Sequence, residues 1–414
     1  MPNRYSSGGE SGFMKVAVIG SGISGLGAAH VLARAHEVTV LERETRAGGH
    51  TRTIRHNGRA LDTGFLVHNE RNYPLLTRLF GELGVRTQPS EMSFSVSCPD
   101  GLEYSGRRPF AQPRRLADPR FLGLLGEIGR FLTTARRSLS GLDESWSLGR
   151  YLDERGFSVR FRREFFVPLT AALWSTAPGR ALEFPAATAI RFFDNHGMLG
   201  FSRFRWRYVS GGSDTYVRAL ADRLGPQLRL GLGARSVRRS PDGVDVTFDD
   251  GSTNRFDAIV IATHADQALQ LLEDPTGEER RVLGAFSYTK NEAILHTDSA
   301  QLPRTVAARA SWNYRVGDDG RPTVTYYLNR LQSLDDETDW CLTLNGDVPE
   351  EHVIDRATFE HPLFTVESVA AQRELPALGG VRRTWFAGAH HGNGFHEDGL
   401  ASGVLAAGSI GVAW

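Results

Sequence analysis

The sequence has 414 residues, too many for one ordinary hydrophobic core, so we expect two domains or one large composite. Its 48 basic and 48 acidic side chains give a formal net charge of zero, which argues against a nucleic-acid partner. The two cysteines, Cys98 and Cys341, provide no disulfide framework and no metal-type cluster, and they indicate a reducing, cytoplasmic location. No run approaches the ~18 apolar residues of a membrane span.

The first predicted element follows a polar stretch, residues 1–13, that we expect to be a disordered tail. Residues Lys15–Ile19 predict a buried strand, and G-x-G-x-x-G follows directly at Gly20, Gly22 and Gly25. The first glycine permits a tight turn, the second lets a pyrophosphate approach the backbone, and the third allows close helix packing. This order predicts the start of a dinucleotide-binding unit.

A helix and a second strand complete this unit. The helix is expected from about Ser24 to Arg34, so that its positive N-terminal end faces the phosphates. The strand, residues 36–41, is followed by Glu42, at the spacing of an acid that accepts a hydrogen bond from a ribose hydroxyl. The pattern predicts a Rossmann-type domain but leaves NAD and FAD open.

The next turn favours FAD. Arg46-Ala-Gly48-Gly49-His50-Thr51 resembles the R-x-G-G-x-x-[ST] extension of the flavin amine oxidase and phytoene desaturase superfamily. In that superfamily the turn passes along the FAD pyrophosphate and ribityl chain. Two adjacent glycines leave room for a rigid cofactor, and an arginine can meet its charge.

The resemblance recurs in the middle of the chain. Residues 227–237 resemble the strand that ends at the adenine, where Val237 would bind through its backbone. A hairpin is expected next, from Val244–Phe248 and Phe256–Ile261, with Asp250-Gly251 at its turn. Residues 259–263 resemble the family's returning strand next to FAD.

The last matching motif lies near the C-terminus. The strand ending at Gly388 and the segment 394–403 resemble the family's final FAD motif, which continues in a helix at about residues 399–411. In the family, that helix points its N-terminus at flavin N1 and O2. The resemblance therefore assigns FAD contacts to twelve residues: Gly20, Gly22, Ser24, Gly25, Glu42, Arg46, Gly48, Gly49, Val237, Gly388, Phe395 and Asp398.

These matches predict an α/β fold with a glutathione-reductase-like FAD domain and an α+β substrate domain. Residues 14–85, 208–285 and 375–414 would form the FAD domain. Residues 86–207 and 286–374 would form the substrate domain.

Two candidate catalytic residues follow from position within the family pattern. Lys290 lies close to the place of the family's lysine that holds a water at flavin N5, and its alternative is an ordinary surface lysine. His396 would contact flavin or substrate, and its alternative is a role in capping the helix that follows. Where the family commonly has an acid after Phe-Ala-Gly, this chain has Ala389, followed by two histidines.

Aromatic residues in the substrate domain predict a largely apolar pocket. The candidate lining residues are Trp174, Phe193, His196, Trp312 and Tyr314. Apolar residues between Phe121 and Leu139 repeat at helical spacing, with arginines near one end. That helix either faces a core or contacts a membrane from which an acyl chain could enter.

A narrower resemblance spans essentially the whole chain. Segments such as LWSTAP and RFFDNHGMLG resemble bacterial NAD/FAD-binding amine-oxidase-like proteins often encoded beside cyclopropane-fatty-acyl synthases. The expected function is an FAD-dependent oxidase or dehydrogenase that takes a hydride equivalent from an apolar, including fatty-acyl, substrate to flavin N5. Amine oxidation and non-redox, flavin-dependent isomerisation are the alternatives. The expected partner is a small molecule or lipid, with peripheral membrane contact left open.

Overall fold

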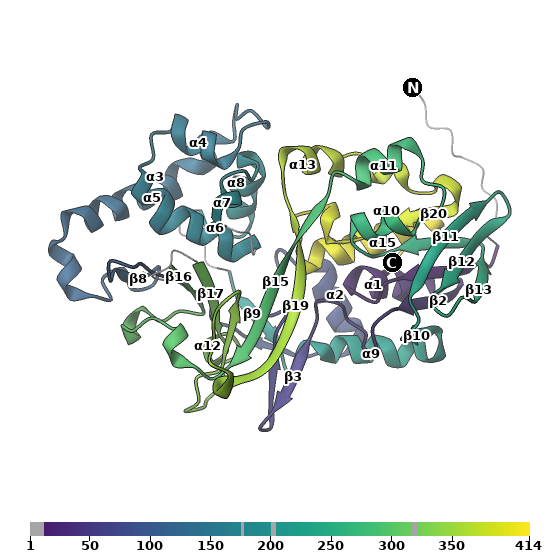
Figure 1. The fold of residues 1–414 in the computed structure, drawn as a ribbon, viewed down its shortest axis with the longest axis horizontal. Coiled ribbons are helices and arrows are strands. Elements are labelled where there is room, and N and C mark those ends of the chain that lie inside the picture. Colours follow the sequence, from purple (N-terminus) through teal and green to yellow (C-terminus); the bar gives the residue numbers. More distant parts are fainter. Residues whose placement is uncertain (1–11, 175–177, 200–203, 317–321) are drawn as a thin grey trace. The chain divides into compact units, whose positions relative to one another are not determined.

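The computed structural model describes residues 12–174, 178–199, 204–316 and 322–414. Contacts between residues group the chain into two units (Figure 1). Unit 1 comprises Met1–Gly49, Ala219–Gly284 and Glu374–Trp414, and unit 2 comprises His50–Arg218 and Ala285–Arg373. Of the expected tail, residues 1–11 lie outside the described residues, and Phe13 is exposed.

At the centre of unit 1 lies a five-stranded parallel sheet in the order β10-β2-β1-β14-β20. Residues 16–19 of β1 and all of β14 are buried, because a parallel sheet is covered on both faces. The strands are β1 (Lys15–Ile19), β2 (Glu37–Glu42), β10 (Leu228–Leu230), β14 (Ala258–Ile261) and β20 (Thr384–Phe386).

Two helices from opposite ends of the chain pack together in unit 1. Helices α1 (Ile23–Leu32) and α15 (His396–Ile410) lie side by side (Figure 1). A Cβ atom at Gly403 would lie 2.1 Å from the Ser24 carbonyl oxygen, so only glycine permits this approach. The other helices wholly within this unit are α10 (Ala265–Leu271), α11 (Gly277–Leu283) and α14 (Leu375–Leu378), and α9 (Asp214–Leu224) is divided between the two units at Ala219.

The middle segment of unit 1 differs from the prediction in two places. The strand predicted over 227–237 is two strands in different sheets, β10 and β11 (Ala234–Ser240), separated at Gly231, whose φ is +70°. The expected hairpin partner Phe256–Ile261 is also divided. β12 (Gly243–Phe248) pairs with β13 (Thr253–Phe256) across the Asp250-Gly251 turn, whereas the following residues form β14 of the parallel sheet.

Unit 2 is built on a seven-stranded sheet in the order β19-β15-β18-β17-β16-β7-β8. Every pair is antiparallel except β16 with β7. Its strands are β7 (Phe94–Ser97), β8 (Glu103–Ser105), β15 (Ser287–His296), β16 (Trp312–Val316), β17 (Pro322–Tyr327), β18 (Cys341–Leu344) and β19 (Val353–Leu363).

Residues 50–85 and 208–218 belong to unit 2, whereas the predicted division assigned them to the FAD domain. Two smaller sheets lie in these parts of unit 2 and in the residues next to them. One pairs β3 (Thr53–His56) with β4 (Arg59–Asp62). The other has the order β5-β9-β6, formed by His68–Asn69, Trp206–Val209 and Thr87–Pro89.

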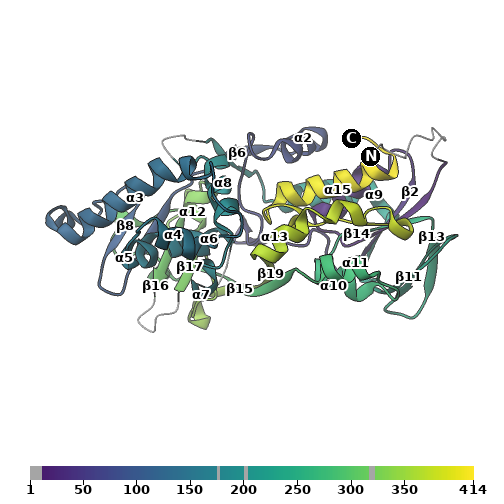
Figure 2. The ribbon, with the colours of Figure 1, turned by 90° about the horizontal axis from the view of Figure 1, so that it is seen from above.

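The helices α3 to α8 of unit 2 gather into one layer (Figures 1 and 2). Its longest member, α3, buries Phe121, Leu124 and Phe131 on one face, as the helical spacing predicts. No helix within the described ranges is long and apolar enough to cross a membrane. The helices wholly within this unit are α2 (Pro74–Leu83), α3 (Pro119–Ser138), α4 (Leu148–Glu154), α5 (Val159–Phe161), α6 (Val167–Trp174), α7 (Pro178–Ala181), α8 (Ala186–Asn195), α12 (Leu328–Leu331) and α13 (Val366–Gln372).

Candidate functional site

The glycine turn after β1 has the geometry that its spacing requires. Gly20 has φ +100°, and a Cβ atom there would lie 2.7 Å from the Ala262 carbonyl oxygen. A Cβ atom at Gly25 would lie 1.9 Å from the Gly20 carbonyl oxygen. At Gly22, by contrast, a Cβ atom would meet no described atom within 4 Å, so the space in front of this residue is open to a ligand.

The N-terminus of α1 lies at this open space. Gly22 is its N-cap, no side chain caps the helix, and no acid lies in its first turn. The first backbone N–H groups of a helix have no partner within the helix, and they carry about half a positive charge together. These donors fit the pyrophosphate of a dinucleotide without further cationic side chains.

The Arg46–Gly49 turn packs directly against the first glycine turn. The Gly48 amide donates to the Ser21 carbonyl oxygen over 3.0 Å. Gly49 has φ +55°, and a Cβ atom there would lie 3.1 Å from Gly22 Cα. Arg46 donates from Nη2 to the Gly49 carbonyl oxygen over 2.9 Å, which holds its guanidinium near the turn. The two motifs that predict FAD therefore form one continuous backbone surface.

Glu42 lies at the end of β2 beside this surface. Its Oε2 accepts hydrogen bonds from the Ser21 amide (2.9 Å) and the Ser21 hydroxyl (2.6 Å), and its Oε1 accepts from the Glu44 amide (2.9 Å). These three bonds fix the orientation of the carboxylate. A carboxylate has about four acceptor positions, so one remains for a ribose hydroxyl.

Val237, the predicted adenine contact, lies on β11 with its side chain fully buried. Its carbonyl oxygen accepts a hydrogen bond from the Glu273 amide over 3.0 Å. An adenine contact at this residue would therefore use its N–H group or the second lone pair of the carbonyl oxygen.

The C-terminal motif brings Gly388 and the start of α15 together. The Gly388 amide donates to the Ser402 hydroxyl over 2.8 Å. A Cβ atom at Gly388 would lie 2.4 Å from the His390 ring, so a side chain does not fit there. Phe395 and His396 are half-buried at the start of α15, and the Phe395 amide donates to Asp398 over 2.9 Å. Burial raises the pKa of the Asp398 carboxyl to about 6.

Two adjacent histidines distinguish this end of unit 1. The rings of His390 and His391 lie 4.8 Å apart. Burial lowers the pKa of His391 to about 4, and burial together with His391 and His264 lowers the pKa of His390 well below its usual range. Both imidazoles are therefore neutral near pH 7, and each can donate or accept a hydrogen bond. In the sequence these two histidines stood out only because they follow Ala389, which stands where the family commonly has an acid.

Trp174 and Phe193 lie within the core of unit 2, whereas the third candidate, His196, is half-buried directly after α8. Trp174 is 4% exposed and Phe193 is fully buried, with ring centres 5.9 Å apart. The His196 ring stacks on Phe192 at 3.8 Å, and burial lowers the pKa of His196 to about 4. These three candidates form one aromatic cluster.

The other two pocket candidates lie on β16, against which α6 packs. Tyr314 is buried, and this burial raises its pKa. Trp312 packs edge-on against Tyr326 at 5.3 Å. Within the described ranges, the buried Trp312 Nε1–H has no acceptor, so it is a donor that a ligand could use.

Lys290 lies on β15, and its side chain is 76% exposed. Its Nζ lies 3.6 Å from Glu360 Oε1 on the neighbouring strand β19. This environment favours the surface-lysine alternative that the sequence left open.

Comparisons with known proteins match this chain to flavin enzymes. A family model described as flavin containing amine oxidoreductase matches residues 23–307. A phytoene dehydrogenase of Streptomyces griseus is 29% identical over 344 residues, which are 72% of this chain and 64% of the relative. The AofH protein of Mycobacterium tuberculosis, which carries the name of a flavin-containing monoamine oxidase, is 28% identical over 288 residues, 65% of this chain and 61% of the relative.

The chain thus matches less than two thirds of the length of either relative. Among solved structures, a CLA-producing fatty acid isomerase from P. acnes has a TM-score of 0.70 at 18% identity, covering 95% of this chain and 97% of that one. This likeness confirms the predicted α/β fold, in which the parallel sheet of unit 1 is of the Rossmann type.

Proposed function

Since the chain belongs to the flavin-containing amine oxidoreductase family, we propose that it is an FAD-dependent oxidase or dehydrogenase acting on an apolar small molecule. One observation carries the cofactor part of this proposal. The uncapped N-terminus of α1 lies against two glycine turns whose backbones touch, at Gly22 and Gly49. A pyrophosphate needs backbone donors and close approach, and this surface offers both.

The bound FAD would supply the hydride acceptor, and the chain would supply binding and orientation. The α1 N-terminus would hold the pyrophosphate and Glu42 the ribose. The first turn of α15, whose predicted cofactor contacts are Phe395 and Asp398, would place the positive end of a helix near the reactive ring. His390 and His391 are neutral and can serve as hydrogen-bond partners without adding charge.

For the substrate, we propose an apolar molecule such as a fatty-acyl compound. The name of the phytoene dehydrogenase relative refers to an apolar substrate. The buried Trp312 Nε1–H on β16, the strand against which α6 packs, has no acceptor among the described residues and could bond to a polar end of such a molecule. Amine oxidation remains the alternative, supported by the name of AofH. Non-redox isomerisation is the third candidate, because the chain shares its fold with a fatty acid isomerase.

We also propose contact with a membrane surface. Five apolar side chains of unit 2 are exposed: Phe110, Leu116, Leu122, Val159 and Val306. Leu122 lies on α3. Thr305, next to Val306, is joined by hydrogen bonds to Glu103 and to Gln112, which lies between Phe110 and Leu116. Arginines are interspersed among them, including Arg114, Arg115 and Arg120. Apolar side chains beside basic ones are typical of proteins that lie on anionic membranes. Cosedimentation with phosphatidylglycerol vesicles should fall in the variant Val159→Asp.

The test of the main proposal uses the purified full chain under anaerobic conditions. The protein should be yellow and should release FAD on denaturation. Linoleic acid, or a monoamine such as benzylamine, is then added while the visible flavin band is followed. Bleaching by linoleic acid supports the proposal, and bleaching only by the amine supports amine oxidation. A rearranged fatty acid with an unchanged flavin spectrum at the end of the reaction would establish isomerisation. A colourless protein that cannot be reconstituted with FAD would refute all three.

A further inference from the structure

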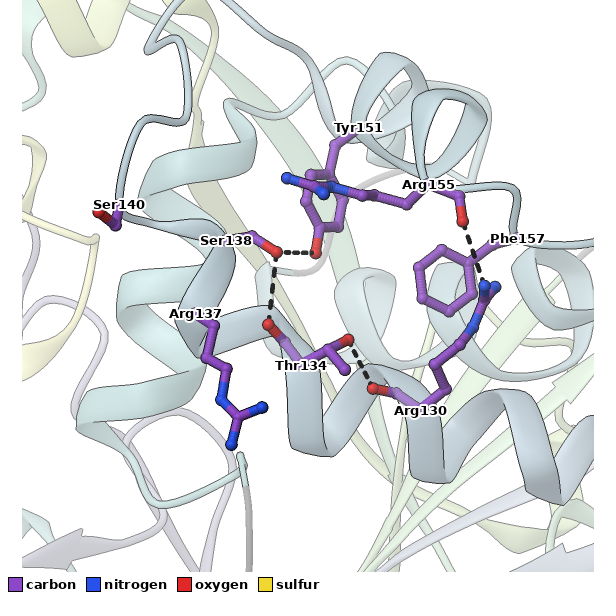
Figure 3. A pocket seen from close by; sticks show the side chains of 8 residues that line it. All are labelled: Arg130, Thr134, Arg137, Ser138, Ser140, Tyr151, Arg155 and Phe157. Carbon is purple, nitrogen blue, oxygen red and sulfur yellow. Dashed lines mark hydrogen bonds between the residues drawn. The ribbon is translucent and has the colours of Figure 1, made fainter.

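A cavity in unit 2 lies where helices α3 and α4 both end (Figure 3). Its volume is about 330 Å³. The polar side chains of its wall that matter here are Arg130, Arg137, Ser138, Ser140, Tyr151 and Arg155. None of them belongs to the candidate flavin or substrate sites, so this cavity needs an explanation of its own.

Arg130 is the fixed arginine of the cavity. Its guanidinium donates to the carbonyl oxygens of Arg155 (3.3 Å) and Gly156 (3.0 Å), and it lies 4.1 Å from the centre of the Phe157 ring. Figure 3 shows this side chain turned toward the Arg155 backbone. These contacts tie the segment after α4 to α3, so they explain Arg130 as a structural residue.

Arg137 and Arg155 have no comparable role. In the part of the chain that the structure describes, neither guanidinium has a carboxylate partner, and Arg155 lies across Tyr151 at 5.9 Å from the ring centre (Figure 3). The neighbouring Arg136, which does not line the cavity, is paired with Asp194 at 3.3 Å. Arg137 and Arg155 therefore line the cavity without a carboxylate partner among the described residues.

Two of the hydroxyl groups in this wall bond to each other. Tyr151, which is 1% exposed, has its hydroxyl 3.0 Å from the Ser138 hydroxyl. Ser138 in turn donates to the Thr134 carbonyl oxygen over 3.4 Å. Ser140 lies at the edge of the group in Figure 3 and carries a further hydroxyl.

The helix ends explain only part of this positive charge. Arginines near helix C-termini interact favourably with the helix dipoles, and each end carries about half a negative charge. Two ends offset about one of the three guanidinium charges. Glu127, 3.9 Å from Arg130, offsets another. No carboxylate lines the cavity, so about one positive charge remains unmatched.

We propose that this cavity binds the phosphate group of a phosphorylated ligand through the guanidinium groups of Arg137 and Arg155, whose exposed side chains can turn toward it. The planar guanidinium fork suits phosphate oxygens, and the Ser140 hydroxyl can add a neutral donor. The volume leaves room for a group attached to the phosphate, which would lie along Tyr151 and Phe157. The phosphate could come from a phospholipid headgroup or from a small soluble compound. The inference does not depend on the flavin chemistry.

The experiment is calorimetric titration of the full chain at constant ionic strength. The probes are inorganic phosphate and monomeric dihexanoylphosphatidylglycerol. We expect saturable binding of at least one probe, weakened about tenfold or more in the double variant Arg137→Gln/Arg155→Gln. The matched control, Arg136→Gln, removes the same charge from the same turn of α3 but outside the cavity, and should bind as the wild type does.

Each outcome has a defined meaning. Binding of the lipid alone identifies a headgroup site, and binding of inorganic phosphate alone identifies a site for a soluble compound. No saturable binding of either probe, or an equal loss in Arg136→Gln, would overturn the proposal. Circular dichroism and thermal unfolding establish that the double variant is folded. If it is not, the single variants Arg137→Gln and Arg155→Gln carry the same test.

Discussion

The two units define their candidate sites in different ways. In unit 1 the site is made of backbone: a Cβ atom at Gly20, Gly25 or Gly403 would lie within 2.7 Å of a carbonyl oxygen. In unit 2 the candidates are side chains, and Trp174 and Phe193 share their surroundings with the hydrophobic core. A backbone site requires particular residues at fixed spacing, so it can be recognised from the sequence. A side-chain site depends on which distant residues meet, so spacing alone does not reveal it.

The largest expected effect tests whether Phe193 belongs to the core. Phe193 is fully buried beside Phe131, Phe166 and Trp174. Phe193→Ala should lower the free energy of unfolding by ~3–5 kcal/mol, because it leaves a large cavity. Phe110→Ala is the control, because Phe110 is 39% exposed and its loss should matter much less. Urea unfolding measures both. Unchanged stability combined with lost turnover would instead identify Phe193 as pocket lining.

The next prediction tests the backbone contact between α1 and α15. Gly403→Ala should lower the free energy of unfolding by ~1–3 kcal/mol and weaken FAD retention, because the new methyl group would meet the Ser24 carbonyl oxygen. Gly408→Ala lies in the same helix and would meet no atom within 4 Å. It should instead stabilise the protein by about 0.5–1 kcal/mol. Similar stability of the two variants would contradict the close packing of these helices.

A third prediction concerns Glu42 within the backbone site. Glu42→Ala should lower FAD affinity by ~1–3 kcal/mol, because a ribose hydroxyl and the Ser21 donors lose their acceptor. Glu44→Ala is the matched control, since only the amide of Glu44 contacts Glu42. Equilibrium dialysis of apoprotein with FAD measures both affinities. Equal affinities in the two variants would show that Glu42 does not contact the ribose.

What the sequence could predict follows the same division. The first strand was predicted at its observed bounds, and the first helix within two residues, because their signals are local. The sequence analysis missed that the strand predicted over residues 227–237 divides at Gly231, since this depends on which sheet each half of the segment joins. The sequence analysis also did not identify Asp62 as a buried carboxyl group. Asp62 accepts hydrogen bonds from Thr53 and Ser213 (2.6 and 2.8 Å), and burial raises its pKa to about 7. No spacing rule connects Asp62 with Ser213, which is 151 residues away.

A fourth prediction uses the buried His296 in unit 2. Its Nδ1 accepts from the Asp298 amide over 3.1 Å, so Nε2–H donates to Thr343 and the ring is neutral. Burial lowers the pKa of His296 from 6.5 to about 4. The unfolded chain therefore takes up a proton first as the pH falls, and stability is full above pH 6.5 and decreases toward pH 4.

In the variant His296→Gln this contribution is absent. Its free energy of unfolding should change less steeply between these pH values, by about 1 kcal/mol per pH unit relative to the wild type. Urea unfolding at a series of pH values gives both slopes. Parallel curves would mean that His296 is protonated in the folded protein at the same pH as in the unfolded chain.

The smallest effect is expected at Lys290, the candidate that position alone placed near the flavin. Its side chain is 76% exposed, and its pairing with Glu360 spans 3.6 Å. Exposed ion pairs contribute about 0–1 kcal/mol, so Lys290→Met should leave folding and FAD content almost unchanged. Rapid-mixing measurements then separate flavin reduction from reoxidation by oxygen. Wild-type rates in both half-reactions would establish the surface-lysine interpretation. A selectively slow reoxidation would show that the position of Lys290 in the sequence had located a functional side chain in unit 2. The division between sites defined by backbone and sites defined by side chains would then be less strict than the two units suggest.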